Sequence, residues 1–155
     1  MKLIKRTYLN TLIEVMGTPD IKVITGIRRS GKSKLLELFK EYIENNVKDY
    51  NIIHINYNDL EFENLKEYHK LNDYIEQRYK ENMRNFILID EVQMCEGFEK
   101  TINSLHSKEK YDIYITGSNA YLLSGELATL LTGRYIEIKM YPLSFKEYAN
   151  YYGKE

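Results

Sequence analysis

Cysteine, proline and tryptophan are scarce in this sequence, and neither sign of charge dominates. Its 155 residues include one cysteine (Cys95), two prolines and no tryptophan. Because one thiol cannot form a disulfide within the chain, a packed hydrophobic core must stabilise the fold. We interpret Cys95 as a small core residue, since a catalytic thiol would need a histidine brought to it from elsewhere in the fold.

Long apolar runs and a net charge are missing as well. Lysine plus arginine total 22 and aspartate plus glutamate total 23, which gives a formal net charge of −1. This balance provides no overall attraction to nucleic acid or to a membrane, although a local basic patch is compatible with it. The basic N-terminus, 1–6, is not followed by the apolar run of a signal peptide, and no stretch approaches the roughly 18 apolar residues of a membrane span. We therefore expect a cytoplasmic protein with no membrane partner.

The sequence does contain short apolar runs that alternate with segments of helical periodicity. The composition, 43% apolar and 29% charged, is typical of a soluble globular domain, and the length suits one compact domain. Short runs rich in β-branched residues predict strands at 21–25, 51–57, 86–89, 112–116 and 135–140. Apolar spacing predicts helices at 7–15, 32–45, 63–83, 96–107, 120–131 and 144–152. This alternation predicts an α/β fold with a parallel sheet of about five strands between helices, and the alternating polarity of 135–140 predicts an edge strand.

One segment carries a specific motif for binding a phosphate. Residues 26–33, GIRRSGKS, match the pattern G-x-x-x-x-G-K-[S/T] in full, between a predicted strand and a predicted helix. The glycines let backbone N–H groups approach a phosphate, and the helix presents its N-terminus to the same anion. Lys32 is expected to reach the β- and γ-phosphates, and Ser33 to offer its hydroxyl to Mg²⁺. The predicted nucleotide-binding residues are Gly26, Arg28, Arg29, Ser30, Gly31, Lys32, Ser33 and Lys34. For Arg28 and Arg29, a solvated position in the loop is the alternative.

A second motif supplies carboxylates. The apolar strand at 86–89 ends in Asp90 and Glu91. At the carboxyl end of that strand, Asp90 would hold Mg²⁺ directly or through water. Glu91 is the candidate for orienting and polarising the water that attacks the nucleotide. This acidic pair favours hydrolysis of a nucleotide over simple storage of it.

Two further positions, Ser118 and Arg134, can be interpreted either as catalytic residues or as ordinary structural residues. Ser118, with Asn119 as second choice, follows the predicted strand 112–116 and would hydrogen-bond the γ-phosphate and the attacking water; an ordinary turn is the alternative. Arg134 would stabilise charge in the transition state, or else lie on the surface at the start of a strand. The predicted catalytic residues are thus Lys32, Glu91, Ser118 and Arg134.

The remaining polar and aromatic residues indicate no additional cofactor. The three histidines show no spacing typical of metal ligands, so no metal is predicted beyond Mg²⁺ bound with ATP. Tyrosines gather near the C-terminus, where they either pack against a further domain or stack on nucleic acid. These tyrosines are Tyr141, Tyr148, Tyr151 and Tyr152.

Together these segments resemble one family. The resemblance is carried by TPDIKVITGIRRSGKS, FILIDEVQ, YITGSNAYLLS and LTGRYIEIKMYPLSFKEY, which span nearly all of the chain. They are similar to the prokaryotic AAA-type ATPases with a GxRRSGKS phosphate loop, which often continue into a C-terminal domain of unknown function. The resemblance implies a RecA-like fold, phosphate contacts at Gly31, Lys32 and Ser33, and γ-phosphate sensing at Ser118. It also implies that residues 1–155 are one ATPase domain from the N-terminal part of a longer protein.

Several functions compete for this pattern. The first is hydrolysis of ATP, with Mg²⁺, to drive a conformational change. The second is a nucleotide-gated switch with little turnover, acting with DNA or a protein partner. A GTPase would carry the guanine-reading motif N-K-x-D, which is absent, and a small-molecule kinase would need several arginines after the acidic strand, where only Arg134 lies. The sequence leaves the oligomeric state open.

Overall fold

The protein is a single parallel sheet between two layers of helices. The computed structural model describes residues 2–27, 31–118, 124–132 and 134–141. In chain order the elements are α1 (Lys2–Val15), β1 (Ile21–Gly26), α2 (Lys32–Asn46), β2 (Tyr50–Asn56), η1 (Leu60–Leu65), α3 (Tyr68–Gln77), β3 (Arg84–Asp90), η2 (Val92–Met94), α4 (Phe98–Ser107), β4 (Tyr111–Ser118), α5 (Ser124–Leu130) and β5 (Tyr135–Met140). The five strands are parallel in the order β2-β3-β4-β1-β5. This confirms the predicted α/β class, the predicted number of strands and the edge position of β5.

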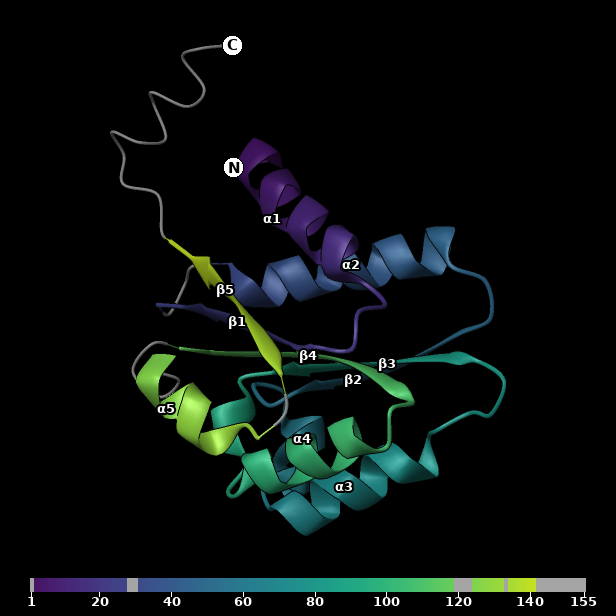
Figure 1. The fold of residues 1–155 in the computed structure, drawn as a ribbon, viewed down its shortest axis with the longest axis vertical. Coiled ribbons are helices and arrows are strands. Elements are labelled where there is room, and N and C mark those ends of the chain that lie inside the picture. Colours follow the sequence, from purple (N-terminus) through teal and green to yellow (C-terminus); the bar gives the residue numbers. More distant parts are fainter. Residues whose placement is uncertain (1, 28–30, 119–123, 133, 142–155) are drawn as a thin grey trace.

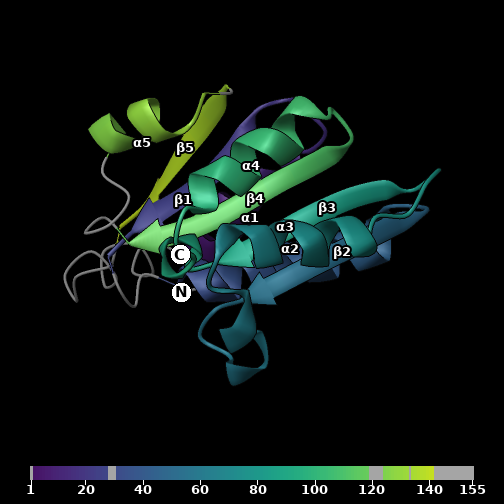
Figure 2. The ribbon, with the colours of Figure 1, turned by 90° about the horizontal axis from the view of Figure 1, so that it is seen from below.

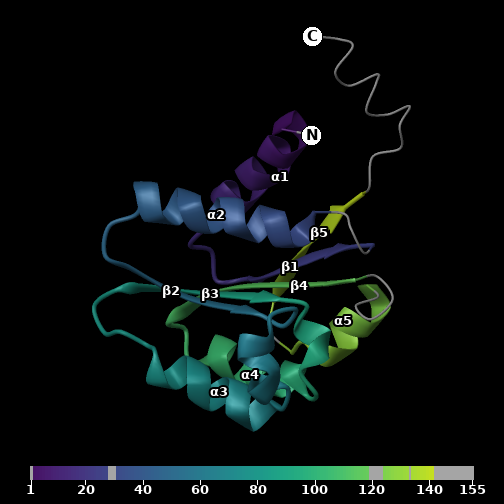
Figure 3. The same cartoon turned by 180° about the vertical axis from the view of Figure 1, so that it is seen from behind.

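Each face of the sheet has its own hydrophobic core. Helices α1 and α2 cover one face, and α3 and α4 cover the other (Figures 1 and 3). The four apolar residues of β3 divide between the cores: Phe86 and Leu88 pack with α1 and α2, while Ile87 and Ile89 pack on the other side. A central parallel strand is buried on both faces, which explains why this strand has no polar alternation. Cys95 is 1% exposed in the second core, and burial raises the pKa of its thiol to about 11.

The helix predicted at 63–83 is wrong in its extent. The structure has a 3₁₀ turn, η1, and a separate helix, α3. Glu67 begins α3 because its side chain accepts hydrogen bonds from the backbone N–H groups of His69 and Lys70 at 3.1 and 3.3 Å. After α3, the side chain of Asn85 bonds the backbone N–H and carbonyl of Lys80 at 3.0 and 2.9 Å. Asn82 adopts a φ of 65°, which a helix does not allow. Local side-chain bonds therefore replace the helix in the second half of this segment.

Other boundaries differ by a few residues, and some predictions fall outside the described ranges. Helix α4 begins at Phe98 instead of 96, because Gly97 precedes it with a φ of 73°. The described part of the helix predicted at 120–131 is α5. The helix predicted at 144–152 lies outside the described residues. Within the described ranges, no helix combines the length and the apolar character needed to cross a bilayer.

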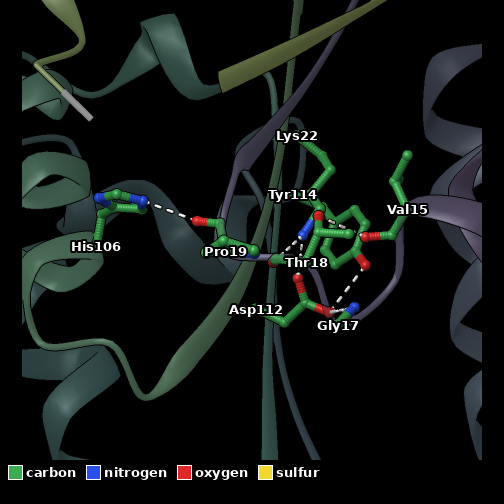
Figure 4. A network of polar contacts seen from close by, with 8 residues as sticks. All are labelled: Val15, Gly17, Thr18, Pro19, Lys22, His106, Asp112 and Tyr114. Atoms are coloured by element: carbon green, nitrogen blue, oxygen red, sulfur yellow. Dashed lines mark hydrogen bonds and ion pairs between the residues drawn. The ribbon is translucent and has the colours of Figure 1, made fainter. Parts of the chain in front are cut away.

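A buried ion pair fixes the amino ends of β1 and β4 (Figure 4). Lys22, whose side chain is 0% exposed, donates to Asp112 Oδ1 at 2.7 Å and to the Thr18 carbonyl at 2.7 Å. The other oxygen of Asp112 accepts hydrogen bonds from the Gly17 N–H and the Tyr114 hydroxyl, both at 2.9 Å. The desolvated charge of Lys22 is thus compensated by groups from two strands and the turn after α1.

We expect Lys22→Met to destabilise the fold by about 3 kcal/mol or more, because removing one member of a buried ion pair leaves the other without its counter-charge. Urea unfolding of the variant measures this loss. Lys34→Met is the matched control, since the ion pair of Lys34 with Glu37 is 3.7 Å long and more than half exposed; its loss should stay below about 1 kcal/mol. Equal losses in the two variants would contradict this account of the buried pair.

Candidate functional site

The residues with predicted chemistry gather where β1, β3 and β4 end. Parallel strands place their carboxyl ends at one edge of the sheet, and Figure 2 shows β1, β4 and β5 ending near one another. Gly26, the last residue of β1, pairs in register with Ser118 of β4. Ile89, just before Asp90, pairs with Ile115 of the same strand β4. The start of the loop, the acidic pair and Ser118 therefore lie on adjacent strands at one edge.

Gly31 and Lys32 form the junction between the loop and α2. Gly31 precedes the helix with φ 95° and ψ 17°, a left-handed conformation that favours glycine, and a glycine has no side chain with which to cap the helix. Lys32 is only 3% exposed, and its Nζ donates to the carbonyls of Gly26 and Ile27 at 3.0 and 3.1 Å. The lysine thus bridges from the helix to the first turn of the loop, beside the N-terminus of α2.

The ammonium group of Lys32 interacts electrostatically with both Asp90 and Glu91. Burial lowers the pKa of Lys32 from its ordinary value, while the negative charges of Glu91 and Asp90 act in the opposite direction. Opposite charges interact more strongly in a desolvated place than on the surface. A buried cation and two acidic residues therefore lie at the same edge of the sheet.

Thr116 of β4 joins the two carboxylate residues. Its hydroxyl donates to Asp90 Oδ1 at 2.5 Å and accepts the backbone N–H of Glu91 at 3.0 Å. Thr116 is 0% exposed and Asp90 is 1% exposed. One hydroxyl thereby holds the orientation of the Asp90 carboxylate and the position of the next residue in the chain.

Glu91 has an unusual backbone. Its φ of 58° and ψ of 54° lie in the left-handed region, which costs a residue with a Cβ about 1–2 kcal/mol. This conformation turns the chain sharply as β3 ends. The Glu91 carboxylate is half-buried, and its Oε2 accepts a hydrogen bond from Gln93 Nε2 at 2.5 Å. A strained residue held by its neighbours is a frequent feature of functional sites.

We expect Thr116→Val to lower the free energy of unfolding by about 1.5–3 kcal/mol, because Asp90 would lose its charge-assisted hydrogen bond while it stays buried. Guanidinium unfolding measures this effect. Thr101→Val is a matched control: Thr101 is also buried, but its hydroxyl donates to the neutral carbonyl of Tyr68 at 2.7 Å. The control should lose about 1 kcal/mol. A smaller loss for Thr116→Val than for Thr101→Val would show that Thr116 does not support the charge of Asp90.

Ser33 and Asp90 carry oxygen donors of the kind that Mg²⁺ prefers. Magnesium prefers oxygen ligands and is bound in such sites by one or two protein oxygens together with phosphates and water. Ser33 is the second residue of α2, directly after Lys32, and the Asp90 carboxylate uses one oxygen for Thr116. In the described ranges no group of three or more histidine, cysteine or acidic side chains forms a metal site. The donors present therefore suit an ion that arrives with phosphate oxygens.

The structure does not bring Arg134 to this edge, and its position matches the alternative interpretation, a surface arginine at the start of a strand. Arg134 directly precedes β5, and its carbonyl accepts the N–H of Ile21 at the start of β1 at 2.8 Å. The six residues of β1 separate that position from Gly26 by about 20 Å. The Arg134 side chain is 82% exposed, with its Nε 3.1 Å from Asp20 Oδ1. It belongs to the amino edge of the sheet.

Other predicted residues are placed on the surface or are not described. The Lys34 side chain is exposed and pairs with Glu37, so it does not point to the loop carbonyls as Lys32 does. Arg28, Arg29, Ser30 and Asn119 lie outside the described residues. Thr116 and Gln93 were missed as site residues. No local signal points to Thr116, because its bonds to Asp90 and Glu91 depend on the pairing of β3 with β4.

Exposed apolar side chains also gather at the carboxyl edge. In the described ranges, the large hydrophobic residues with high exposure are Ile27, Leu60, Met94 and Tyr141. Ile27 follows β1, Leu60 follows β2, Met94 follows β3 and Tyr141 follows β5. This edge therefore combines buried charges with apolar groups that are open to contact.

The sheet order, the loop between β1 and α2, and the acidic end of β3 define the class: the domain is a P-loop NTPase of the α/β type. A family model described as an AAA domain matches residues 18–149, and the chain belongs to this family.

The chain is similar to two curated proteins in sequence and to one solved structure in fold. It is 45% identical over 148 residues to an uncharacterised protein of Haemophilus influenzae, covering 94% of this chain and 37% of that protein. It is 33% identical over 148 residues to one of Methanocaldococcus jannaschii, covering 95% and 32%. The chain thus spans about a third of the length of these relatives. Domain III of the Thermotoga maritima replication initiation protein DnaA superposes with a TM-score of 0.61 at 22% identity, covering 95% of this chain and 66% of that one, a likeness of fold.

Proposed function

We propose that this domain binds ATP together with Mg²⁺ and hydrolyses it to ADP and phosphate, and that the hydrolysis drives a conformational change. The single observation that carries the proposal is that the buried Lys32 lies at the carboxyl edge with Asp90 and Glu91, whose charges act on it, at the N-terminus of α2. An anion is stabilised at such a helix terminus by backbone N–H groups and by the helix dipole. Membership of an AAA family supports a nucleotide as that anion.

Each residue has a distinct part in the proposed reaction. Lys32 would exchange its bonds to the loop carbonyls for the β- and γ-phosphates. Ser33 and Asp90 would hold Mg²⁺, which neutralises the developing charge on the phosphates. Glu91 would orient the attacking water and accept its proton, and Ser118, across from Gly26, would hydrogen-bond the γ-phosphate. Thr116 would keep Asp90 and Glu91 in position.

Calorimetric titration with ATP in the presence and absence of Mg²⁺ tests the binding step, and steady-state phosphate release tests turnover. We expect saturable binding that weakens when Mg²⁺ is chelated, and weaker binding of GTP. Absence of saturable ATP binding would refute the proposal as a whole. Binding without any phosphate release would leave only the second function below.

The second candidate is a nucleotide-gated switch with little turnover, which acts with a protein or DNA partner. The exposed apolar residues at the carboxyl edge favour it, because a partner that contacts Ile27 and its neighbours along this edge would also sense the nucleotide. The two functions share the binding site and differ at Glu91, so the rate of phosphate release separates them.

We also propose that residues 1–155 are one ATPase domain at the N-terminal part of a longer, cytoplasmic protein. The length of the curated relatives supports this, since the matched region is about a third of each. A further region in the whole protein would then receive the conformational change. Limited proteolysis of the protein expressed from the parent gene should release a stable fragment of about the length of residues 1–155.

A further inference from the structure

A cavity of about 440 Å³ lies at the amino edge of the sheet, across the molecule from the phosphate loop. Its walls come from the turn after α1 (17–19), the start of β3 (83–86) and, between α4 and β4, from His106 and residues 109–112. This volume is within the range of about 300–1,000 Å³ that is typical of small-molecule sites. None of the residues assigned to the nucleotide lines it, so the cavity needs a separate explanation.

Two cations line the cavity without a carboxylate partner among the described residues. The Arg84 guanidinium carbon lies 5.4 Å from the centroid of the Phe86 ring. The Lys110 ammonium lies 4.1 Å from the Tyr79 ring centroid and 5.8 Å from that of Tyr111. In the described part of the chain, neither forms an ion pair. Aromatic contacts hold these side chains in place and leave their N–H donors for a ligand.

Asp112 and His106, which also line the cavity, already form hydrogen bonds within the fold. Both oxygens of Asp112 accept hydrogen bonds from within the fold, and Lys22 neutralises its charge (Figure 4). His106 Nε2 lies 2.8 Å from the Pro19 carbonyl and donates to it. Glu109 is the other carboxylate of the lining, and its side chain is exposed. Arg84, Lys110 and Glu109 are all exposed, and two cations against one carboxylate give this part of the lining a net positive charge.

One further polar group is unused. The hydroxyl of Tyr111, a residue of the lining, is buried and has no hydrogen-bond partner within the described residues. A buried donor without a partner carries a cost that a bound acceptor would remove. The apolar part of the lining includes Pro19 and Met83, which offer contacts to a hydrocarbon body.

We propose that this cavity binds an organic carboxylate with an apolar or aromatic body. Arg84 recognises the carboxylate, because a guanidinium can donate two parallel N–H bonds to it, and Lys110 adds positive charge to the lining. Pro19 and Met83 contact the body of the ligand. The carboxylate belongs either to a small acid or to an acidic side chain of a partner, and the chemistry recognised is the same.

The probe is 3-phenylpropionate, titrated into the ¹⁵N-labelled chain and followed by NMR. We expect a dissociation constant on the order of millimolar from its small number of non-hydrogen atoms. The amide shifts should change at 17–18, 84–86 and 109–112 and stay constant at the start of α2. A carboxylate probe is chosen because a phosphate would also compete for the phosphate loop.

Arg84→Gln and Lys110→Gln should each weaken binding by about tenfold, through loss of a charge-assisted contact. Lys108→Gln is the control, because Lys108 pairs with Glu76 and is not part of the lining; it should bind as the parent chain does. Equal affinity for the neutral 3-phenylpropionamide, shift changes confined to the phosphate loop, or no saturable binding would each overturn the proposal. Tight binding of an acidic peptide but not of the small acid would identify the source as a protein partner. The result does not depend on whether the domain hydrolyses ATP.

Discussion

Glu91→Gln should reduce the steady-state rate of phosphate release by about 10²–10⁴-fold, the usual contribution of a positioned general base. Glutamine has the same shape, but its amide cannot accept a proton from the attacking water. The left-handed backbone of Glu91, its N–H bond to Thr116 and its contact with Gln93 fix where this carboxylate lies, so the lost function is local. Phosphate release at saturating Mg·ATP measures the change.

Binding should respond differently from turnover in the same variant. Calorimetry should give nearly the same affinity for ATP, because Glu91 is assigned to the water and not to the phosphates. Glu96→Gln is the matched control, since Glu96 is an exposed carboxylate five residues along the same chain segment; its rate should equal that of the parent chain. An equally slow release in the parent chain and in Glu91→Gln would favour the switch over the hydrolase.

Most of the fold was predictable because its signals are local. The apolar runs of β1 and β3 and the glycine-bounded loop are each contained in fewer than ten adjacent residues, and parallel strands follow from their alternation with helices. The helix predicted at 63–83 was wrong because two asparagines, Asn82 and Asn85, control the chain after α3. Their preference for turns was visible in the sequence, but the register that lets Asn85 reach Lys80 was not.

The candidate site was predicted in part for the same reason. Asp90 and Glu91 could be placed beside Lys32 because residues that follow parallel strands meet at one edge. The same rule places Arg134 at the opposite edge of the sheet, because Arg134 precedes β5 instead of following it. The catalytic interpretation of Arg134 considered only that the residue is next to a strand. Thr116 could not be assigned, because its bonds to Asp90 and Glu91 depend on the pairing of β3 with β4.

Lys32→Ala should weaken ATP binding by about ten- to 150-fold, which corresponds to the roughly 1.5–3 kcal/mol of a hydrogen bond to a charged group. In the structure, the buried ammonium of Lys32 donates hydrogen bonds to two loop carbonyls. The negative charges of Asp90 and Glu91 also attract it. Burial disfavours this charge, and a phosphate would stabilise it more than neutral carbonyls do. Affinity by calorimetry, together with a thermal melt to show that the fold persists, measures the effect.

The neighbouring lysine separates a specific contact from general electrostatic attraction. Lys34→Ala removes the same charge two residues away, but the Lys34 side chain is exposed and paired with Glu37, so its affinity for ATP should change by less than about twofold. Lys32→Arg keeps the charge but replaces a compact ammonium with a planar group, and should restore only part of the binding. If Lys32→Ala and Lys34→Ala weaken binding equally, the attraction is a property of the whole basic segment. Lys32 would then lose its assigned contact with the phosphates, and the site would have to be sought elsewhere.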